Sequence, residues 1–71
     1  MMIDLSRQEI EQAIDTWIVG RNAERDREIL KRRLIDGTTY ERLAEIFDLS
    51  DRQIKNIVYK RQEAIYKHVP I

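Results

Sequence analysis

Three side chains near the start of the last predicted helix have the types and spacing suited to hydrogen bonding with base edges. Arg52, Lys55 and Asn56 stand at positions i, i+3 and i+4, so a helix places them on one face. Arginine and lysine can donate to guanine O6 and N7, and asparagine can bond adenine through two atoms. We therefore predict that these residues read DNA bases, with an ordinary solvated helix surface as the alternative.

Polar neighbours of this triplet have two kinds of predicted role. Asp51 could accept from a cytosine amino group, or it could favour the helix N-terminus, and we prefer the second role because an acid in the first turn needs no functional reason. Three further side chains are better placed for phosphates, namely Thr39, Tyr59 and Lys60. Taken singly, Lys60, Arg61 and Lys67 are expected to be ordinary surface cations.

Four predicted helices must position these residues, and no strand is expected. Glycine occurs only at 20 and 37 and proline only at 70, so each marks the end of a helix. The first helix follows Ser6 and closes at Gly20, and the second lies between Asn22 and Gly37. A short third helix starts at Thr38 or Thr39, and a fourth runs from Asp51 to about His68, so that a helix-turn-helix spans about 39–67.

Capping patterns set these boundaries. Ser6 with Glu9, and Ser50 with Gln53, have the spacing of capping boxes, in which each side chain accepts a hydrogen bond from the backbone N–H of the other residue. Asn22 is expected to cap the second helix, and either Thr38 or Thr39 is expected at the start of the third.

Apolar residues recur at helical spacing in each segment. Trp17 is expected in the core with the stripe formed by Ile10, Ile14 and Ile18. Two further stripes are predicted, one of Tyr40, Leu43, Ala44 and Phe47 in the third helix, and one of Ile54, Ile57, Val58, Arg61 and Ile65 on one side of the fourth.

Length and composition limit the function classes. The 71 residues predict one domain, 1–71, and 13 basic residues balance 13 acidic ones. Acidic residues dominate positions 1–20 and basic residues positions 51–71, so charge is unevenly distributed. Without cysteine, catalytic sets or a long apolar run, we expect a cytoplasmic protein that is not an enzyme, with no cofactor, metal, membrane or small-molecule substrate.

Three segments are the most specific part of the sequence between about Asn22 and Val69, namely ERDREIL (24–30), DGTTYERLAE (36–45) and LSDRQIKNI (49–57). With these segments, residues from about Asn22 to Val69 resemble region 4 of bacterial sigma factors and the small regulators similar to it. The resemblance implies that Asp51, Arg52, Lys55 and Asn56 approach bases and that Thr39 and Gln53 lie near phosphates or the cap. It also implies recognition of a promoter element and contact between the upstream helices and RNA polymerase.

The leading hypothesis is therefore a small transcriptional regulator, of the kind phages and bacteria encode, that binds double-stranded DNA. The chain has no segment resembling region 2, so we do not expect a complete sigma factor, and the acid at position 51 removes one expected basic contact. Because one small module buries little surface, a homodimer on a two-fold site is expected. The rival hypothesis is a protein-interaction module or phage packaging adaptor that keeps the helix-turn-helix as a scaffold, and the neutral net charge favours it.

Overall fold

The computed structural model of this chain describes residues 7–68. They form four helices, α1 (Arg7–Trp17), α2 (Ala23–Leu34), α3 (Tyr40–Phe47) and α4 (Asp51–His68). Because no strand occurs among these residues, the predicted all-α class with four helices is confirmed. None of the helices in this range is long and apolar enough to cross a membrane.

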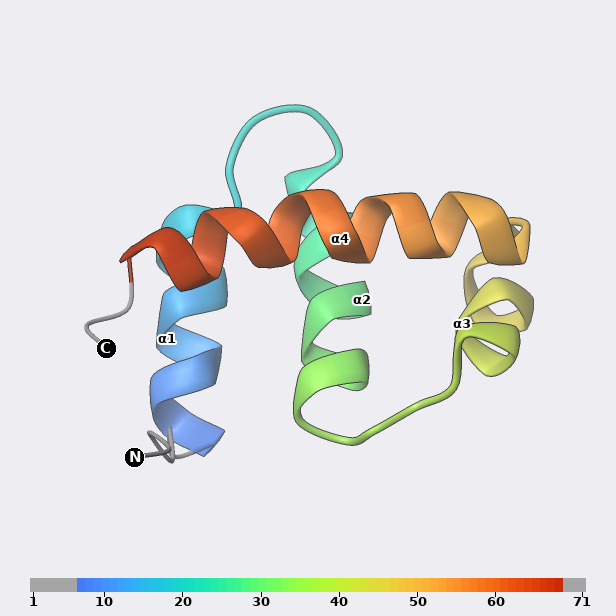
Figure 1. The fold of residues 1–71 in the computed structure, drawn as a ribbon, viewed down its shortest axis with the longest axis horizontal. Helices are drawn as coiled ribbons and strands as arrows, with labels where there is room; N and C mark the ends of the chain where they lie inside the picture. Colours follow the sequence, from blue (N-terminus) through green and yellow to red (C-terminus); the bar gives the residue numbers. More distant parts are fainter. Residues whose placement is uncertain (1–6, 69–71) are drawn as a thin grey trace.

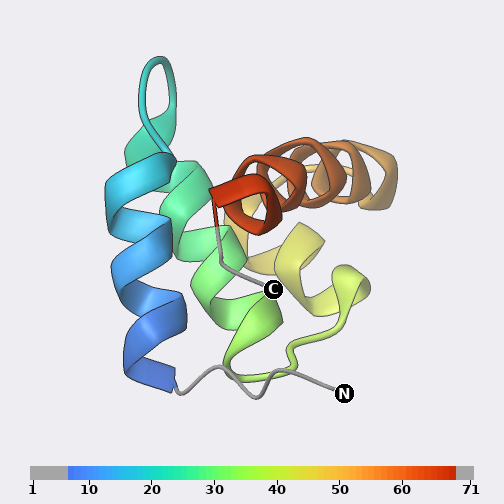
Figure 2. The same cartoon turned by 60° about the vertical axis from the view of Figure 1, so that its left-hand side comes forward.

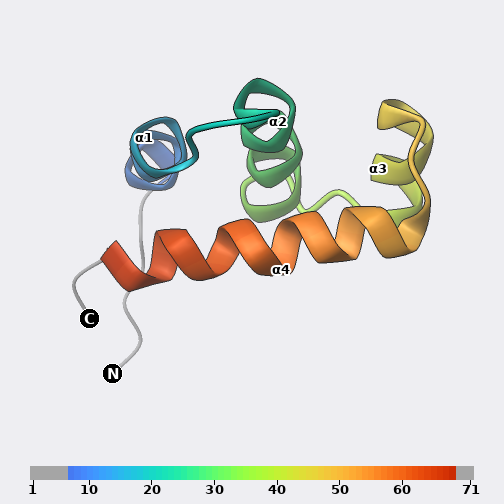
Figure 3. The same cartoon turned by 90° about the horizontal axis from the view of Figure 1, so that it is seen from above.

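The long helix α4 packs against the other three helices along one of its sides. Helices α1 and α2 lie side by side, and α4 crosses both (Figure 1, Figure 2). Seen from above, α1, α2 and α3 stand in a row along one side of α4 and leave its opposite side uncovered (Figure 3). Since each of the three contacts α4, the packed side of that helix is continuous along its length.

Every helix, together with the residue that follows α1, contributes to one apolar core. Its fully buried members are aliphatic, and burying each such side chain contributes roughly 1.5–3 kcal/mol. They are Ile14, Ile18, Ile29, Leu30, Leu43, Ile54, Val58 and Ile65. The core therefore lies where α4 crosses the row of the other helices.

The predicted capping box at the start of α4 is confirmed, and of the two threonines expected at the start of α3, Thr39 is the cap. Thr39 Oγ1 accepts a hydrogen bond from the backbone N–H of Arg42 at 3.1 Å. At α4, the backbone N–H of Ser50 donates to Gln53 Oε1 at 2.9 Å, and the N–H of Gln53 donates to Ser50 Oγ at 3.1 Å. This reciprocal pair satisfies two backbone donors and fixes where α4 begins.

A connection of three residues, Asp48 to Ser50, joins α3 to α4. Asp48 adopts a left-handed conformation with φ 54°, and the N–H of Leu49 returns to the Ala44 carbonyl at 3.0 Å. The hydrogen bond closes the end of α3, so the chain turns sharply into the Ser50 cap. The short, bonded connection fixes the angle between the two helices.

The boundary between α1 and α2 differs from the prediction. α1 ends at Trp17 rather than at Gly20, which lies in the following turn with φ 91°. Asn22 occupies the N-cap position of α2, but its side chain makes no capping hydrogen bond, so that prediction was wrong. A side-chain cap needs an extended backbone, and Asn22 is left-handed with φ 60°. Ser6, the predicted cap of α1, lies outside the described residues.

Trp17 was wrongly placed in the core. Its exposed fraction is 41%, whereas Ile14 and Ile18 are fully buried. These isoleucines are four residues apart and define a narrow stripe, and Trp17 stands about 100° around the helix from Ile18. The packing of α2 and α4 covers that stripe and leaves the indole at its edge.

The apolar stripe of α3 is only partly enclosed. Leu43 is fully buried, and the other predicted members, Tyr40, Ala44 and Phe47, are half-buried and packed against the core. Since α3 contacts α2 and α4 but stands at the end of the row, one flank stays open to solvent.

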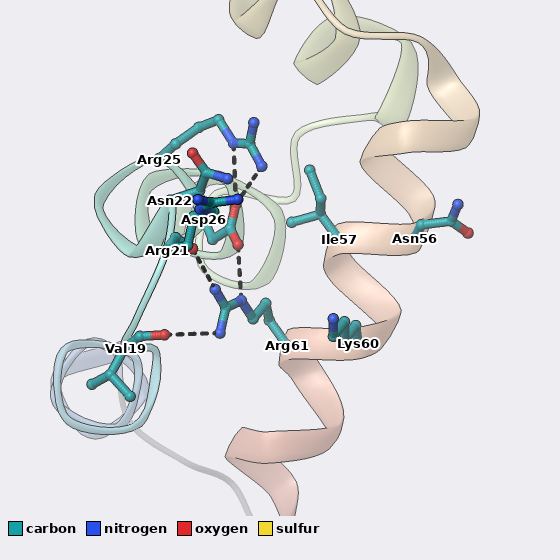
Figure 4. A pocket seen from close by; sticks show the side chains of 9 residues that line it. All are labelled: Val19, Arg21, Asn22, Arg25, Asp26, Asn56, Ile57, Lys60 and Arg61. Atoms are coloured by element: carbon teal, nitrogen blue, oxygen red, sulfur yellow. Dashed lines mark hydrogen bonds and ion pairs between the residues drawn. The ribbon is translucent and has the colours of Figure 1, made fainter.

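Arg61 is a half-buried anchor and not the surface cation that was expected. Its Nε donates to Asp26 Oδ2 at 2.8 Å, and its two terminal nitrogens donate to the carbonyls of Val19 and Arg21, each at 3.1 Å (Figure 4). Asp26 is 4% exposed and also accepts from Arg25. Arg61 lies on the predicted packed side of α4, where it binds α2 and the α1–α2 connection together.

Candidate nucleic-acid interface

The structure brings the three predicted base-reading residues together on one exposed face. Arg52, Lys55 and Asn56 all lie in the first two turns of α4, and all are exposed. The other helices pack against the opposite side of α4 (Figure 3). No other described part of the chain covers these side chains, so their donors face solvent.

The other predicted site residues on α4 are exposed as well. Asp51 is the first residue of the helix, where its charge complements the N-terminal dipole. Tyr59 and Lys60 follow the triplet by one turn and are exposed. The predicted contacts on α4 therefore occupy about three turns of one helix.

Gln53 and Thr39 serve first as caps. The Gln53 carbonyl oxygen and the Thr39 hydroxyl oxygen each accept a backbone hydrogen bond at the start of a helix. Both side chains are exposed, and both retain a donor, the Gln53 amide nitrogen and the Thr39 hydroxyl hydrogen. Each cap therefore leaves one side-chain donor that its capping hydrogen bond does not use.

A cluster on the α3 side of this face was not predicted as part of the site. The guanidinium carbon of Arg33 lies 4.3 Å from the centre of the Tyr40 ring, and Lys55 Nζ lies 5.7 Å from it. The Tyr59 ring meets the Tyr40 ring edge to face, with centres 6.3 Å apart. We call these four residues, Arg33, Tyr40, Lys55 and Tyr59, the Tyr40 cluster. Sequence spacing could not reveal it, because its members come from three helices.

The cluster raises the pKa of the Tyr59 hydroxyl. Hydrogen bonding with the Tyr40 hydroxyl is the largest cause that raises the pKa of Tyr59 above its ordinary value of 10.0, followed by electrostatic repulsion from Tyr40 and by burial. The positive charge of Arg33 acts in the opposite direction. Tyr59 is uncharged at neutral pH, as an unperturbed tyrosine also is, and a phenolic hydroxyl can donate to a phosphate oxygen.

A groove of about 460 Å³ lies on the other side of α4, against the α1–α2 connection (Figure 4). Its lining includes Arg21, Asn22 and Arg25 from the chain around the start of α2, and Asn56 and Lys60 from α4. Among the described residues, Arg21 and Lys60 form no ion pair. Cationic side chains therefore flank the exposed face of α4 on both sides.

Although the net charge is zero, ion pairs in the described range leave two cations of the α4 face unpaired. Five acidic side chains in the described range are paired with nearby bases, namely Asp15, Asp26, Glu28, Asp36 and Glu45. In contrast, Arg52 and Lys55 form no ion pair within that range. Asp51, the first residue of α4, also forms no ion pair in that range, so its carboxylate offsets part of the positive charge that Arg52 and Lys55 present.

Comparison with protein-family models, curated proteins and solved structures found no match to this chain. Within residues 7–68, no group of three or more histidine, cysteine, aspartate or glutamate side chains could hold a metal ion. The physical character of the α4 face must therefore carry any assignment of function.

Proposed function

We propose that this protein binds double-stranded DNA sequence-specifically, with α3 and α4 acting as a helix-turn-helix and α4 lying in the major groove. The observation that carries the proposal is the exposed triplet Arg52, Lys55 and Asn56 at the leading end of α4. Recognition helices use their N-terminal residues for base edges, while the preceding helix crosses the backbone. The short capped helix α3 is suited to crossing the DNA backbone in this way.

The chemistry of the triplet supports base reading. The major groove is wide enough for a helix, and each base pair presents a different pattern of donors and acceptors there. Arg52 and Lys55 suit guanine and Asn56 suits adenine, whereas Asp51 at the helix start could select a cytosine amino group. The site therefore favours a short sequence that contains both guanine and adenine.

Phosphate contacts would come from both sides of α4. Thr39, Gln53 and Tyr59 offer uncharged donors beside α3, and Lys60 and Arg21 offer cations beside the groove. Such contacts fix the position of a protein on the duplex and supply most of its salt-dependent affinity. The donors beside α3 and the cations beside the groove would each contact one of the two DNA strands that border the major groove.

A role in transcription is supported by the likeness of residues 22–69 to region 4 of sigma factors. On this proposal the protein is a small cytoplasmic regulator, of phage or bacterial origin, and α1 with α2 contacts RNA polymerase. A homodimer on a two-fold site would raise the affinity that one small module can reach.

The first test is the salt dependence of binding to duplexes selected from random DNA. We expect the logarithm of the association constant to fall with the logarithm of salt concentration, with a slope near −0.9 per phosphate contact. Arg52→Ala should cost about 1–3 kcal/mol on the selected site and relax the preference at one base pair. Equal loss on every sequence would contradict base reading by Arg52.

The second candidate function is a protein-interaction or phage packaging adaptor that uses the same helices as a scaffold. Its specific support is the net charge of zero. A protein partner held by apolar contacts would bind almost independently of salt, so the same titration separates the two functions.

A further inference from the structure

Tyr40 receives two cations on its ring from two different helices. Arg33 of α2 lies 4.3 Å from the ring centre and Lys55 of α4 lies 5.7 Å from it. Both distances are within the range in which the negative face of an aromatic ring attracts a cation. The ring itself is half-buried and packed against the core, so it is a fixed platform.

Neither cation has an acidic partner among the described residues. Arg33 donates to the Thr38 carbonyl at 3.1 Å, and Lys55 forms no ion pair. A lysine on an exposed helix face samples many rotamers, and ordering it on binding costs conformational entropy. A ring that attracts the ammonium group reduces this freedom before DNA arrives, while the three N–H donors stay available.

We infer that Tyr40 is a positioning residue that holds Lys55 in its base-reading orientation and so sets the preference at the base pair that Lys55 contacts. This inference rests on the proposed DNA binding. Tyr40 itself touches no base; it acts through the side chain of Lys55. The Tyr59 ring meets the Tyr40 ring at an angle of 73° and restricts the movement of the Tyr40 ring on that side.

The contact can be tested without DNA, by nuclear magnetic resonance of the free protein. A proton above an aromatic face is shifted upfield, so the side-chain protons of Lys55 should resonate upfield of those of Lys67. Tyr40→Leu should abolish the upfield shift, and Tyr40→Phe, which keeps the ring, should preserve it. An unchanged Lys55 spectrum in Tyr40→Leu would overturn the inference.

The specificity role is tested by a double-mutant cycle on the selected duplex. Tyr40→Leu should weaken binding by roughly two- to fivefold, the factor expected for an exposed cation–aromatic contact, and should relax preference at one base pair. In a Lys55→Ala background the same change should have almost no further effect. Tyr40→Phe is the matched control and should bind as the wild-type protein does.

A change in folding is separated from a change in positioning by fluorinated phenylalanine at position 40. Added fluorine atoms weaken the negative ring face while keeping the size of the ring. Affinity should fall stepwise with fluorine number at an unchanged melting temperature. A constant affinity, or equal losses with and without Lys55, would overturn the positioning role alone. If the wild-type protein binds no duplex DNA, both the proposed function and the positioning role of Tyr40 fail.

Discussion

Two arginines on α4 show how one helix supports both structure and recognition. Arg52 and Arg61 are nine residues apart, which is about two and a half turns, so they project from opposite faces. The side chain of Arg61 is 20% exposed and pairs with Asp26, whereas Arg52 is exposed and has no ion pair in the described range. The same residue type stabilises the fold at one position and remains available to a partner at the other.

The surroundings of Arg61 explain why a charge is tolerated there. A guanidinium has five N–H donors, and removing it from water is costly unless those donors are bonded. Asp26 and the carbonyls of Val19 and Arg21 accept from all three of its nitrogens. Arg61 therefore fixes how α4 crosses α2, and that crossing angle determines which way the exposed face of α4 points.

The largest expected effect is the loss of stability in Asp26→Ala. Removing one partner of a buried pair leaves Arg61 uncompensated, and we expect a loss of about 3 kcal/mol from the free energy of unfolding. Arg52→Ala should change this free energy by less than about 0.5 kcal/mol, because the side chain is exposed and unpaired. Urea unfolding of the two variants measures the difference directly.

Arg25→Ala is the matched control for that experiment. Arg25 also pairs with Asp26, at 3.1 Å, but its side chain is 37% exposed. Its loss should cost less than about 1 kcal/mol, because Arg61 still neutralises Asp26 and solvent screens the outer pair. If Arg25→Ala proved as costly as Asp26→Ala, the anchoring role of Arg61 would have to be abandoned.

Sequence patterns predicted the features that depend on local spacing. The start of α4 follows from Ser50 and Gln53, and the exposed triplet follows from its positions relative to Ile54 and Val58. These relations lie within one helix and its cap, so helical geometry determines them.

Contacts between distant residues could not be predicted in the same way. Asp26 and Arg61 are 35 residues apart, and the Tyr40 cluster joins three helices. Such pairs depend on the crossing angles of helices, for which spacing within a helix gives no information. Trp17 was misplaced for a related reason, because burial depends on which neighbouring helix covers each edge of a stripe.

A smaller effect is expected at the start of the recognition face, from Ser50→Ala. Loss of the capping hydroxyl should reduce the free energy of unfolding by about 1 kcal/mol. The first turn of α4 should also fray, so DNA affinity should fall even where the protein remains fully folded. Gln12→Gly weakens α1 at an exposed position outside the proposed DNA interface and is the control for a general loss of helix stability. Equal DNA affinity in Ser50→Ala and the wild-type protein would show that the cap does not order Arg52.

The smallest expected effect is on the pKa of Tyr59. Here the charge of Arg33 acts on an exposed side chain, in contrast to the pairing of Arg61 with buried Asp26. Because Tyr40 raises this pKa and Arg33 lowers it, Tyr40→Phe should bring it back toward 10.0, and Arg33→Ala should raise it further. A pKa raised by folding favours the neutral phenol, so its contribution to stability is present below pH 10 and is lost as the pH rises through the folded value. Titration of the Tyr59 ring resonance measures the pKa in the wild-type protein and in both variants.

Opposite changes of this pKa in the two variants would establish that both side chains act on Tyr59 in solution. An ordinary Tyr59 pKa in the wild-type protein would contradict the packing of the Tyr40 cluster. The two variants therefore test a cation, Arg33, that acts on Tyr59 with no acidic partner in the described range, in contrast to Arg61, which pairs with the buried carboxylate of Asp26.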